Sequence, residues 1–307
     1  MKTFSKMVIA LGLLLSTHQH IHANSKVGFS MPDSLDEYTV QYTSFDNLIV
    51  LPFIINDSIK VNLILDTGCR NIILFGRKFK KQMRITPTKS IEFSGMGAGK
   101  SVSGMLSLNN SISLGQITGE NVPMIVVPKR GVFQDYSGID GLIGYDIFTK
   151  FEVELNPATQ HITFRSAFSS FVPYGYTQIP MKVSDAQPIL QSTIEIQDES
   201  YTWDLLIDTG SSLGLLLKST DFDILENSVT YHSQLGRGLN GVINGKKTVA
   251  ERLLLDNFEF NKLTTGIIYT PWYDYASIGM DILKDYSIIL NYVQSYICLK
   301  KVSMAGA

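Results

Sequence analysis

The sequence is poor in cysteine and histidine, which excludes several kinds of site. Its 307 residues include two cysteines, Cys69 and Cys298, and five histidines. Two cysteines cannot build the disulfide framework of a small exported domain, and nothing in their spacing favours a bridge between them. Three of the histidines fall in the segment HQHIH (18–22), so a zinc site in the rest of the chain would lack ligands. We therefore expect no metal site.

Charge of one sign and long apolar runs are also scarce. Basic residues number 26 and acidic residues 28, so the formal net charge of −2 does not favour nucleic acid or an anionic membrane. The apolar run at 7–15 follows Lys2 and Lys6 and is too short to span a bilayer. This layout predicts a signal peptide over residues 1–23. We expect no membrane span and an exported monomer, periplasmic or extracellular.

Short runs rich in β-branched and aromatic residues dominate the rest of the chain. Examples are IVLPFII (49–55), VNLILD (61–66) and DLLIDT (204–209), each set off by Gly, Asn, Asp or Pro. Helical periodicity is rare, and the best candidates for short helices are FGRKFKKQM (75–83) and DFDILEN (221–227). The pattern predicts an all-β fold.

Three segments of the first half recur in the second half in the same order. VNLILDTGC (61–69) returns as WDLLIDTGS (203–211), and LIGYDIFTKFEVELN (142–156) returns as SIGMDILKDYSIILN (277–291). The glycine cluster at 95–97 returns at 236–238. Such recurrence indicates one ancestral unit present twice. We predict an N-terminal lobe over 24–172 and a C-terminal lobe over 173–307, with the linker near 166–180.

The glycine-rich stretch FSGMGAGKSVSG (93–104) looks like a phosphate-binding loop, but its context does not fit. A P-loop is followed directly by a helix, whereas VSGMLSLNN (102–110) is a poor first helical turn. The second copy, GRGLNGVING (236–245), has no Lys-Ser pair after its glycines. Both copies therefore predict a glycine-rich hairpin and no nucleotide site.

Each repeat carries the tripeptide Asp-Thr-Gly directly after an apolar run, at 66–68 and 208–210. One such tripeptide is an ordinary strand-ending turn. Two copies related by a two-fold axis would bring two carboxylates together, and adjacent carboxylates share one proton and titrate as a pair. The ionised member can take a proton from water while the protonated member polarises a carbonyl group. That is general acid–base hydrolysis.

This arrangement resembles the aspartic peptidases of the retropepsin and pepsin kind, in a two-lobed single chain, from about Ile49 to Lys301. The resemblance implies a bilobal acid-protease fold with two pseudo-symmetric β-barrel-like lobes and few short helices. It makes Asp66 and Asp208 the catalytic pair of an exported endopeptidase acting on an extended polypeptide. Since the nucleophile would be water, no cofactor is implied.

The resemblance also assigns supporting residues. Thr67 and Thr209 would interlock across the lobe interface, and the segments ending in Gly144 and Gly279 would brace the catalytic loops. The full supporting set is Thr67, Gly68, Cys69, Thr209, Gly210, Ser211, Gly144 and Gly279. The substrate-binding flap would comprise Gly95, Met96, Gly97, Ala98 and Gly99. Its second-lobe equivalent would be the segment 237–241, with Arg237 and Gly238.

The chain departs from the family pattern at several points. No tyrosine occurs between Ile91 and Leu108, where pepsin-like enzymes have one in the flap, and residues 24–48 are short and acidic, so we expect no pepsin-type zymogen. Cys69 stands where Ser211 stands in the second copy, and a thiol is the weaker hydrogen-bond donor. We hypothesise that Asp208 is therefore ionised and Asp66 protonated. The other interpretation of Cys69 is a small buried residue that fills space.

Two other readings compete with an aspartic peptidase. A Ser-His-Asp or Cys-His hydrolase would need His161, in an alternating strand, or His232, in an expected loop, and neither has a nucleophile elbow as companion. A non-catalytic peptide-binding protein on the same fold is the stronger rival. Intact Asp-Thr-Gly in both repeats speaks against it, because a binder has no chemical need for either aspartate.

Overall fold

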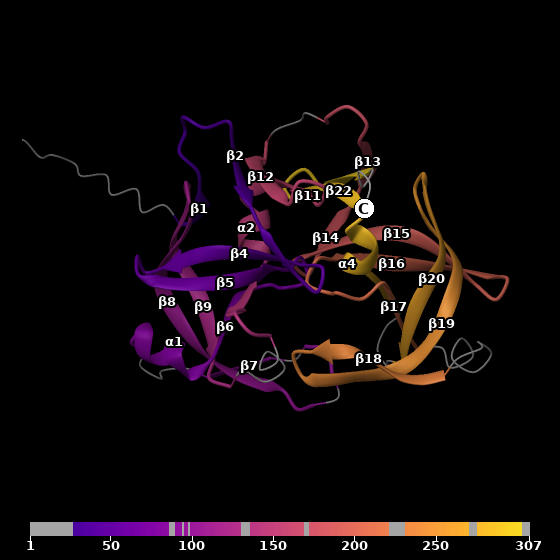
Figure 1. Ribbon diagram of the computed structural model, residues 1–307, viewed down its shortest axis with the longest axis horizontal. Helices are drawn as coiled ribbons and strands as arrows, with labels where there is room; N and C mark the ends of the chain where they lie inside the picture. The colour runs from indigo at the N-terminus through magenta and orange to yellow at the C-terminus, as the bar shows by residue number, and fades with distance from the viewer. Residues whose placement is uncertain are drawn as a thin grey trace, which may run out of the picture.

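The computed structural model describes residues 27–85, 90–93, 95–97, 99–129, 136–168, 172–220, 231–269 and 275–302. The expected signal peptide (1–23), Ala98 and the candidate helix at 221–227 lie outside this described part. Figure 1 shows two groups of strands on opposite sides of the molecule, one from each half of the chain, with further strands above and between them.

The first half forms a nine-stranded sheet that curls into a barrel-like lobe. Its neighbour order is β1-β9-β6-β10-β5-β4-β8-β7, with β3 paired to β4, and an added β8–β9 pairing closes the ring. The strands are β1 (Gly28–Ser30), β3 (Thr43–Phe45), β4 (Leu48–Ile55), β5 (Ile59–Leu65), β6 (Ile72–Phe75), β7 (Ser90–Phe93), β8 (Val102–Leu114), β9 (Ile117–Val127) and β10 (Gly141–Ile143). The sheet carries helices α1 (Arg77–Gln82) and α2 (Tyr145–Phe148).

The second half forms an eight-stranded sheet in the same way. Its order is β14-β15-β16-β21-β17-β20-β19-β18, and a β15–β19 pairing closes it. The strands are β14 (Lys182–Ser184), β15 (Gln187–Ile196), β16 (Glu199–Asp208), β17 (Leu215–Ser219), β18 (Tyr231–Gly238), β19 (Gly241–Leu255), β20 (Phe258–Tyr269) and β21 (Tyr275–Gly279). Helix α4 (Met280–Leu283) follows directly.

The two sheets repeat one topology. The run β9-β6-β10-β5-β4 in the first lobe corresponds strand by strand to β20-β17-β21-β16-β15 in the second. Each run contains a parallel pair at its centre, β5 with β10 and β16 with β21. Two of the recurring segments, 61–69 with 203–211 and 142–156 with 277–291, therefore belong to equivalent strands and turns of two similar lobes. The glycine clusters differ locally, since 95–97 lie in the connection after β7 and 236–238 end strand β18.

A third sheet of six strands joins the halves. Its order is β13-β23-β22-β11-β12-β2. The strands are β2 (Glu37–Gln41), β11 (Phe151–Asn156), β12 (His161–Ser166), β13 (Thr177–Pro180), β22 (Tyr286–Asn291) and β23 (Tyr296–Lys301). At its centre β11 runs antiparallel to β22, with Val153 opposite Leu290. Strand β13 falls inside the expected linker at 166–180, so that region also contributes an edge strand.

Burial follows the position of each strand in its layer. Strand β5 alternates between buried and exposed side chains at its start, and Leu63, Ile64 and Leu65 at its end are all buried because the chain covers both of their faces. Helix α1 forms within FGRKFKKQM, as predicted, and buries Phe79. The described helices are three and short. The predicted all-β, bilobal fold is confirmed.

Candidate active site

Asp66 and Asp208 occupy equivalent places in the two lobes. Asp66 directly follows β5, and Asp208 is the last residue of β16. In each case the carboxylate accepts a hydrogen bond from the backbone N–H two residues later, from Gly68 at 2.7 Å and from Gly210 at 3.0 Å. These bonds fix both carboxylates at the start of a tight turn.

The two carboxylates converge on one space. A Cβ atom placed on Gly68 would lie 3.1 Å from Asp66 Oδ1 and 3.4 Å from Asp208 Oδ1. A Cβ atom on Gly210 would lie 2.1 Å from Asp66 Cγ, closer than any side chain can approach. Glycine is needed at position 210, since a larger residue would displace the Asp66 carboxylate, and a side chain at position 68 would fit only tightly between the two carboxylates.

Thr67 and Thr209 connect the two loops beneath the carboxylates. The backbone N–H of Thr67 donates to Thr209 Oγ1 at 3.1 Å, and that of Thr209 donates to Thr67 Oγ1 at 2.9 Å. The hydroxyls in turn donate to carbonyl groups of the opposite lobe, Ile207 at 2.5 Å and Leu65 at 2.8 Å. Both threonines are fully buried, so the four bonds are shielded from water.

Gly144 and Gly279 lie against the backs of these loops. A Cβ atom on Gly144 would approach the carbonyl oxygen of Asp66 to 2.1 Å, and one on Gly279 would approach that of Leu213 to 2.4 Å. The residues that follow them close the contact. Tyr145 N–H donates to the carbonyl of Cys69 at 2.9 Å, and Met280 N–H donates to that of Ser211 at 2.7 Å.

The surroundings of the two carboxylates are unequal. Burial, followed by the charge of Asp208, raises the pKa of Asp66 from 3.8 to about 8. Burial raises the pKa of Asp208 only to about 6, because the Gly210 N–H and the charge of Lys218 stabilise its ionised form. The pKa of Asp66 is therefore raised further than that of Asp208.

The direction agrees with the sequence hypothesis, but the cause proposed there is wrong. The Cys69 thiol donates to the carbonyl of Asn71 at 3.0 Å, and the Ser211 hydroxyl accepts from Leu213 N–H at 3.3 Å. Among the interactions of the described residues, neither side chain donates to a carboxylate of the pair. The difference comes from the charge of Asp208, which raises the pKa of Asp66 further, and from the charge of Lys218, which lowers that of Asp208. Both Cys69 and Cys298 are buried free thiols.

The two glycine-rich hairpins meet at their tips. Gly99 N–H donates to the carbonyl of Asn240 at 2.7 Å, and Asn240 N–H donates to the carbonyl of Met96 at 2.9 Å. The side-chain oxygen of Asn240 also accepts from Gly95 N–H at 3.1 Å. We call this set of three bonds the tip clasp. A Cβ atom on Gly97 would lie 2.7 Å from the Asn240 backbone, so the contact depends on glycine.

The second hairpin supplies the other side of the clasp. A Cβ atom on Gly238 would lie 2.2 Å from the carbonyl oxygen of Met96, while Arg237 pairs with Val242 in the β18–β19 ladder. Asn240 lies in the segment 237–241 expected as the second-lobe equivalent of the flap, but the sequence assigned it no role of its own. The signal that could have found it is the Asn-Gly pair at 240–241, which favours a tight hairpin turn. The structure has the turn at Leu239-Asn240, one residue earlier, because Gly238 pairs with Gly241.

Met96 links the clasp to the loop after Asp208. It packs against a small apolar cluster of the second lobe, and Leu213 belongs to the same cluster. The complete apolar cluster comprises Met96, Leu213, Leu216, Leu235, Ile243 and Ile268. The first hairpin therefore reaches across to the lobe that holds Asp208.

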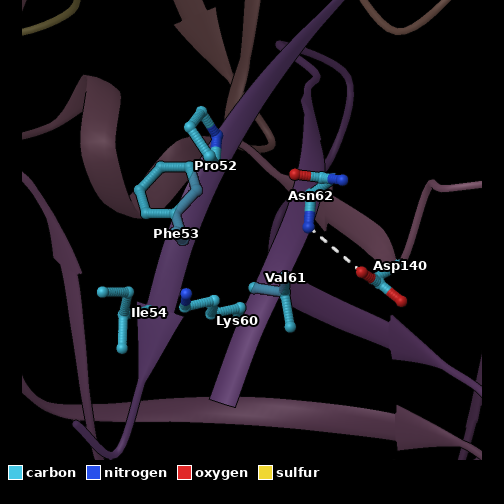
Figure 2. A pocket seen from close by; sticks show the side chains of 7 residues that line it. All are labelled: Pro52, Phe53, Ile54, Lys60, Val61, Asn62 and Asp140. Atoms are coloured by element: carbon cyan, nitrogen blue, oxygen red, sulfur yellow. Dashed lines mark hydrogen bonds between the residues drawn. The ribbon is translucent and has the colours of Figure 1, made fainter. Parts of the chain in front are cut away.

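The described residues offer little support for other sites. Figure 2 shows a pocket lined by residues of β4 and β5 and by Asp140, and none of the residues expected in the site lines it. Its volume is about 420 Å³, and the backbone N–H of Asn62 donates to the Asp140 carboxylate there at 3.1 Å. His232 lies in strand β18, not in the loop expected for it. Within the described ranges no three His, Cys, Asp or Glu side chains gather as metal ligands, and no helix is long and apolar enough to cross a membrane.

Comparison with known proteins finds a similarity in the first repeat. Residues 51–147 match the family model described as aspartyl protease. The matched segment contains Asp66, the first glycine hairpin and Gly144. No curated protein matches the chain. The match supports an aspartic peptidase, and residues 51–147 are similar to aspartyl proteases.

Proposed function

We propose that this chain is an aspartic endopeptidase that hydrolyses peptide bonds with Asp66 and Asp208. The observation that carries the proposal is the convergence of both carboxylates on the space beside Gly68. The shared proton follows from that convergence, because two buried carboxylates side by side cannot both ionise at low cost.

Each residue of the pair takes one role in the proposed reaction. Asp208, ionised, accepts a proton from a bound water, and the water oxygen attacks the carbonyl carbon of the scissile bond. Asp66, protonated, donates its proton to the carbonyl oxygen, which yields a tetrahedral diol. Asp208 then returns its proton to the amide nitrogen, Asp66 recovers a proton from the diol, and the C–N bond breaks.

The substrate would be an extended polypeptide held beneath the two hairpins. Extended peptides bind through backbone hydrogen bonds, with alternate side chains in pockets. A closed tip clasp would also keep bulk water away from the carboxylates and strengthen their effect on the carbonyl group. Opening of the clasp would then admit substrate and release products.

A cleavage assay tests the proposal. Residues 24–307 would be incubated with denatured protein and a peptide library over a range of pH, with and without pepstatin. We expect cleavage that Asp66→Asn and Asp208→Asn each reduce by at least about 1,000-fold, since removal of either partner of a catalytic unit costs nearly as much as removal of both. Asp57→Asn and Asp198→Asn, in exposed turns of the two lobes, serve as matched controls.

The outcomes separate the proposal from its rival. Tight peptide binding without cleavage would indicate a non-catalytic peptide-binding protein on the same fold. Cleavage that survives both aspartate substitutions would show that another group performs the chemistry.

We further propose that the chain is exported, with residues 1–23 as signal peptide and lobes over 24–172 and 173–307. When the full chain is expressed and the cells are fractionated, the product should be recovered outside the cytoplasm. Its N-terminus should lie near Asn24. Removal of residues 2–23 should retain it inside. A cytoplasmic full-length product would contradict export without affecting the proposed chemistry.

A further inference from the structure

Lys218 places a positive charge at the end of an apolar strand. It follows Leu215, Leu216 and Leu217 in β17, all of which are buried, and its own side chain is partly buried. Its ammonium group donates to the Tyr275 hydroxyl at 2.7 Å and lies 4.1 Å from the centre of that ring. Tyr275 stands directly opposite Lys218 in the β17–β21 ladder, so the ring holds the ammonium in one position.

The first lobe has no such charge at the equivalent place. In β6, Leu74 pairs with Gly141 of β10, and in β17, Leu217 pairs with Ala276 of β21. Gly141 and Ala276 are equivalent in the sequence repeat, so Lys218 takes the place of Phe75, which is buried. Placing an ammonium group where an apolar ring fits is costly unless a partner compensates its charge.

The described part of the chain supplies no carboxylate within ion-pairing distance of Lys218. An ammonium group has three N–H donors, and the hydrogen bond to Tyr275 uses one of them. Burial lowers the pKa of Lys218 from 10.5 to about 8, and the charge of Asp208 acts in the opposite direction. The mutual effect of Lys218 and Asp208 indicates that the ammonium lies within electrostatic reach of the proposed catalytic pair.

Strand geometry directs Lys218 toward the region under the hairpins. Side chains two residues apart on a strand share a face, so Lys218 and Leu216 point the same way. Leu216 packs in the apolar cluster with Leu213, five residues after Asp208, and with Met96 at the hairpin tip. The ammonium therefore shares the face of β17 on which the loop after Asp208 meets the first hairpin.

We propose that Lys218, held in place by Tyr275, is a specificity-determining residue that binds the carboxylate of an acidic side chain in the substrate. This inference rests on the proposed peptidase function. A carboxylate bound there would accept hydrogen bonds from the two remaining N–H groups of Lys218. Charge-assisted hydrogen bonds in a partly buried site favour a carboxylate over a neutral group of the same shape. Glutamate and glutamine form the natural pair for comparison, because they differ in charge and hardly in shape.

The test compares matched peptides on one enzyme. Amidated peptides that differ only by Glu or Gln would be scanned across positions on both sides of the cleaved bond, and kcat/KM measured at one pH. We expect a preference for Glu of about 10-fold at one position. The Glu/Gln ratio is the readout because a change in the pKa of the catalytic pair alters both rates alike and leaves their ratio unchanged.

Variants assign the preference to Lys218. Lys218→Met should bring the ratio close to one, Lys218→Glu should favour a Lys peptide over Glu, and Lys218→Arg should keep a preference for Glu. Tyr275→Phe should weaken it, because the ammonium loses its hydroxyl partner. Lys301→Met, at an exposed position of β23, is the matched control and should retain the wild-type ratio.

The inference and the proposed function can fail separately. Efficient cleavage of Glu and Gln peptides at equal rates, or a Lys218→Met variant with the wild-type ratio, would overturn the inference alone. A preference only for peptides with a free C-terminal carboxylate would also overturn it, because the bound group would then be a chain end. Absence of cleavage for every peptide would overturn both. The wild-type ratio needs no variant, so a misfolded variant leaves the test valid.

Discussion

Thr67 and Thr209 each accept, on the side-chain oxygen, the backbone N–H of the other, at 2.9 and 3.1 Å. The reciprocal pair lies 142 residues apart in the sequence and fully buried in the structure. Each threonine directly follows an aspartate of the proposed pair in the sequence. These hydrogen bonds therefore fix the distance between the two carboxylates more directly than other contacts between the lobes do.

Removal of either hydroxyl should destabilise the protein. Thr67→Val or Thr209→Val leaves a buried N–H and a buried carbonyl without partners, at about 1–3 kcal/mol for each unsatisfied group. The double variant should cost less than the sum of the single ones, because the bonds are shared. Urea unfolding measures both. Thr39→Val, which breaks an exposed hydroxyl pair with Thr163, is the control and should change stability by less than about 0.5 kcal/mol. Additive costs for the single variants would contradict the coupling.

The pH dependence of cleavage should follow the two raised pKa values. The pair holds one proton between about 6, where Asp208 ionises, and about 8, where Asp66 ionises. We therefore expect a bell-shaped pH profile of kcat/KM for an uncharged peptide. The apparent pKa values of both its limbs should lie above 3.8, the ordinary pKa of aspartate. A maximum below 3.8 would show that burial does not set the pKa of the pair.

Lys218, and not Ser211, should lower the pKa of Asp208. Its positive charge favours the ionised carboxylate, so Lys218→Met should move the acid limb of the profile to higher pH. Ser211→Ala should leave that limb nearly in place, since the hydroxyl accepts from Leu213. The pH profiles of the two variants decide between the causes. A larger shift for Ser211→Ala would restore the explanation drawn from the sequence.

The raised pKa of Asp66 should also appear in stability. A carboxyl group whose pKa is higher in the folded than in the unfolded state binds its proton more tightly when folded. Its contribution to the free energy of unfolding is therefore greatest at low pH and declines as the pH rises from 3.8 to about 8, by at most about 1.4 kcal/mol per pH unit. Urea unfolding at several pH values should show a smaller decline for Asp66→Asn. An unchanged decline would contradict the shift.

The tip clasp should open when Asn240 loses its side chain. Asn240→Ala removes the bond to Gly95 N–H, one of the three that join the hairpins, and costs about 1 kcal/mol. We expect faster amide hydrogen exchange at Gly95 and Gly99 and a higher KM for peptide. Asn244→Ala, at an exposed position of β19, is the control on the same hairpin. Unchanged exchange at both glycines would show that the hairpins stay together without this bond.

Patterns along the chain determined the fold class, the repeat and the identity of the candidate pair. Strand periodicity is a local property, so it can be recognised in a short segment of sequence. The two copies of Asp-Thr-Gly can be recognised because duplication preserves the order of the segments around them. The same logic predicted hairpins at both glycine clusters, which the structure has at β7–β8 and β18–β19.

The tertiary structure alone decided which groups surround that pair. The approach of Asn240 to Met96 and the pairing of Lys218 with Tyr275 arise from sheet register and from contact between lobes. Neither is encoded within a short segment. The unequal pKa values of the aspartates depend on burial and on a charge ten residues away in the sequence, which the neighbouring residues Cys69 and Ser211 could not reveal.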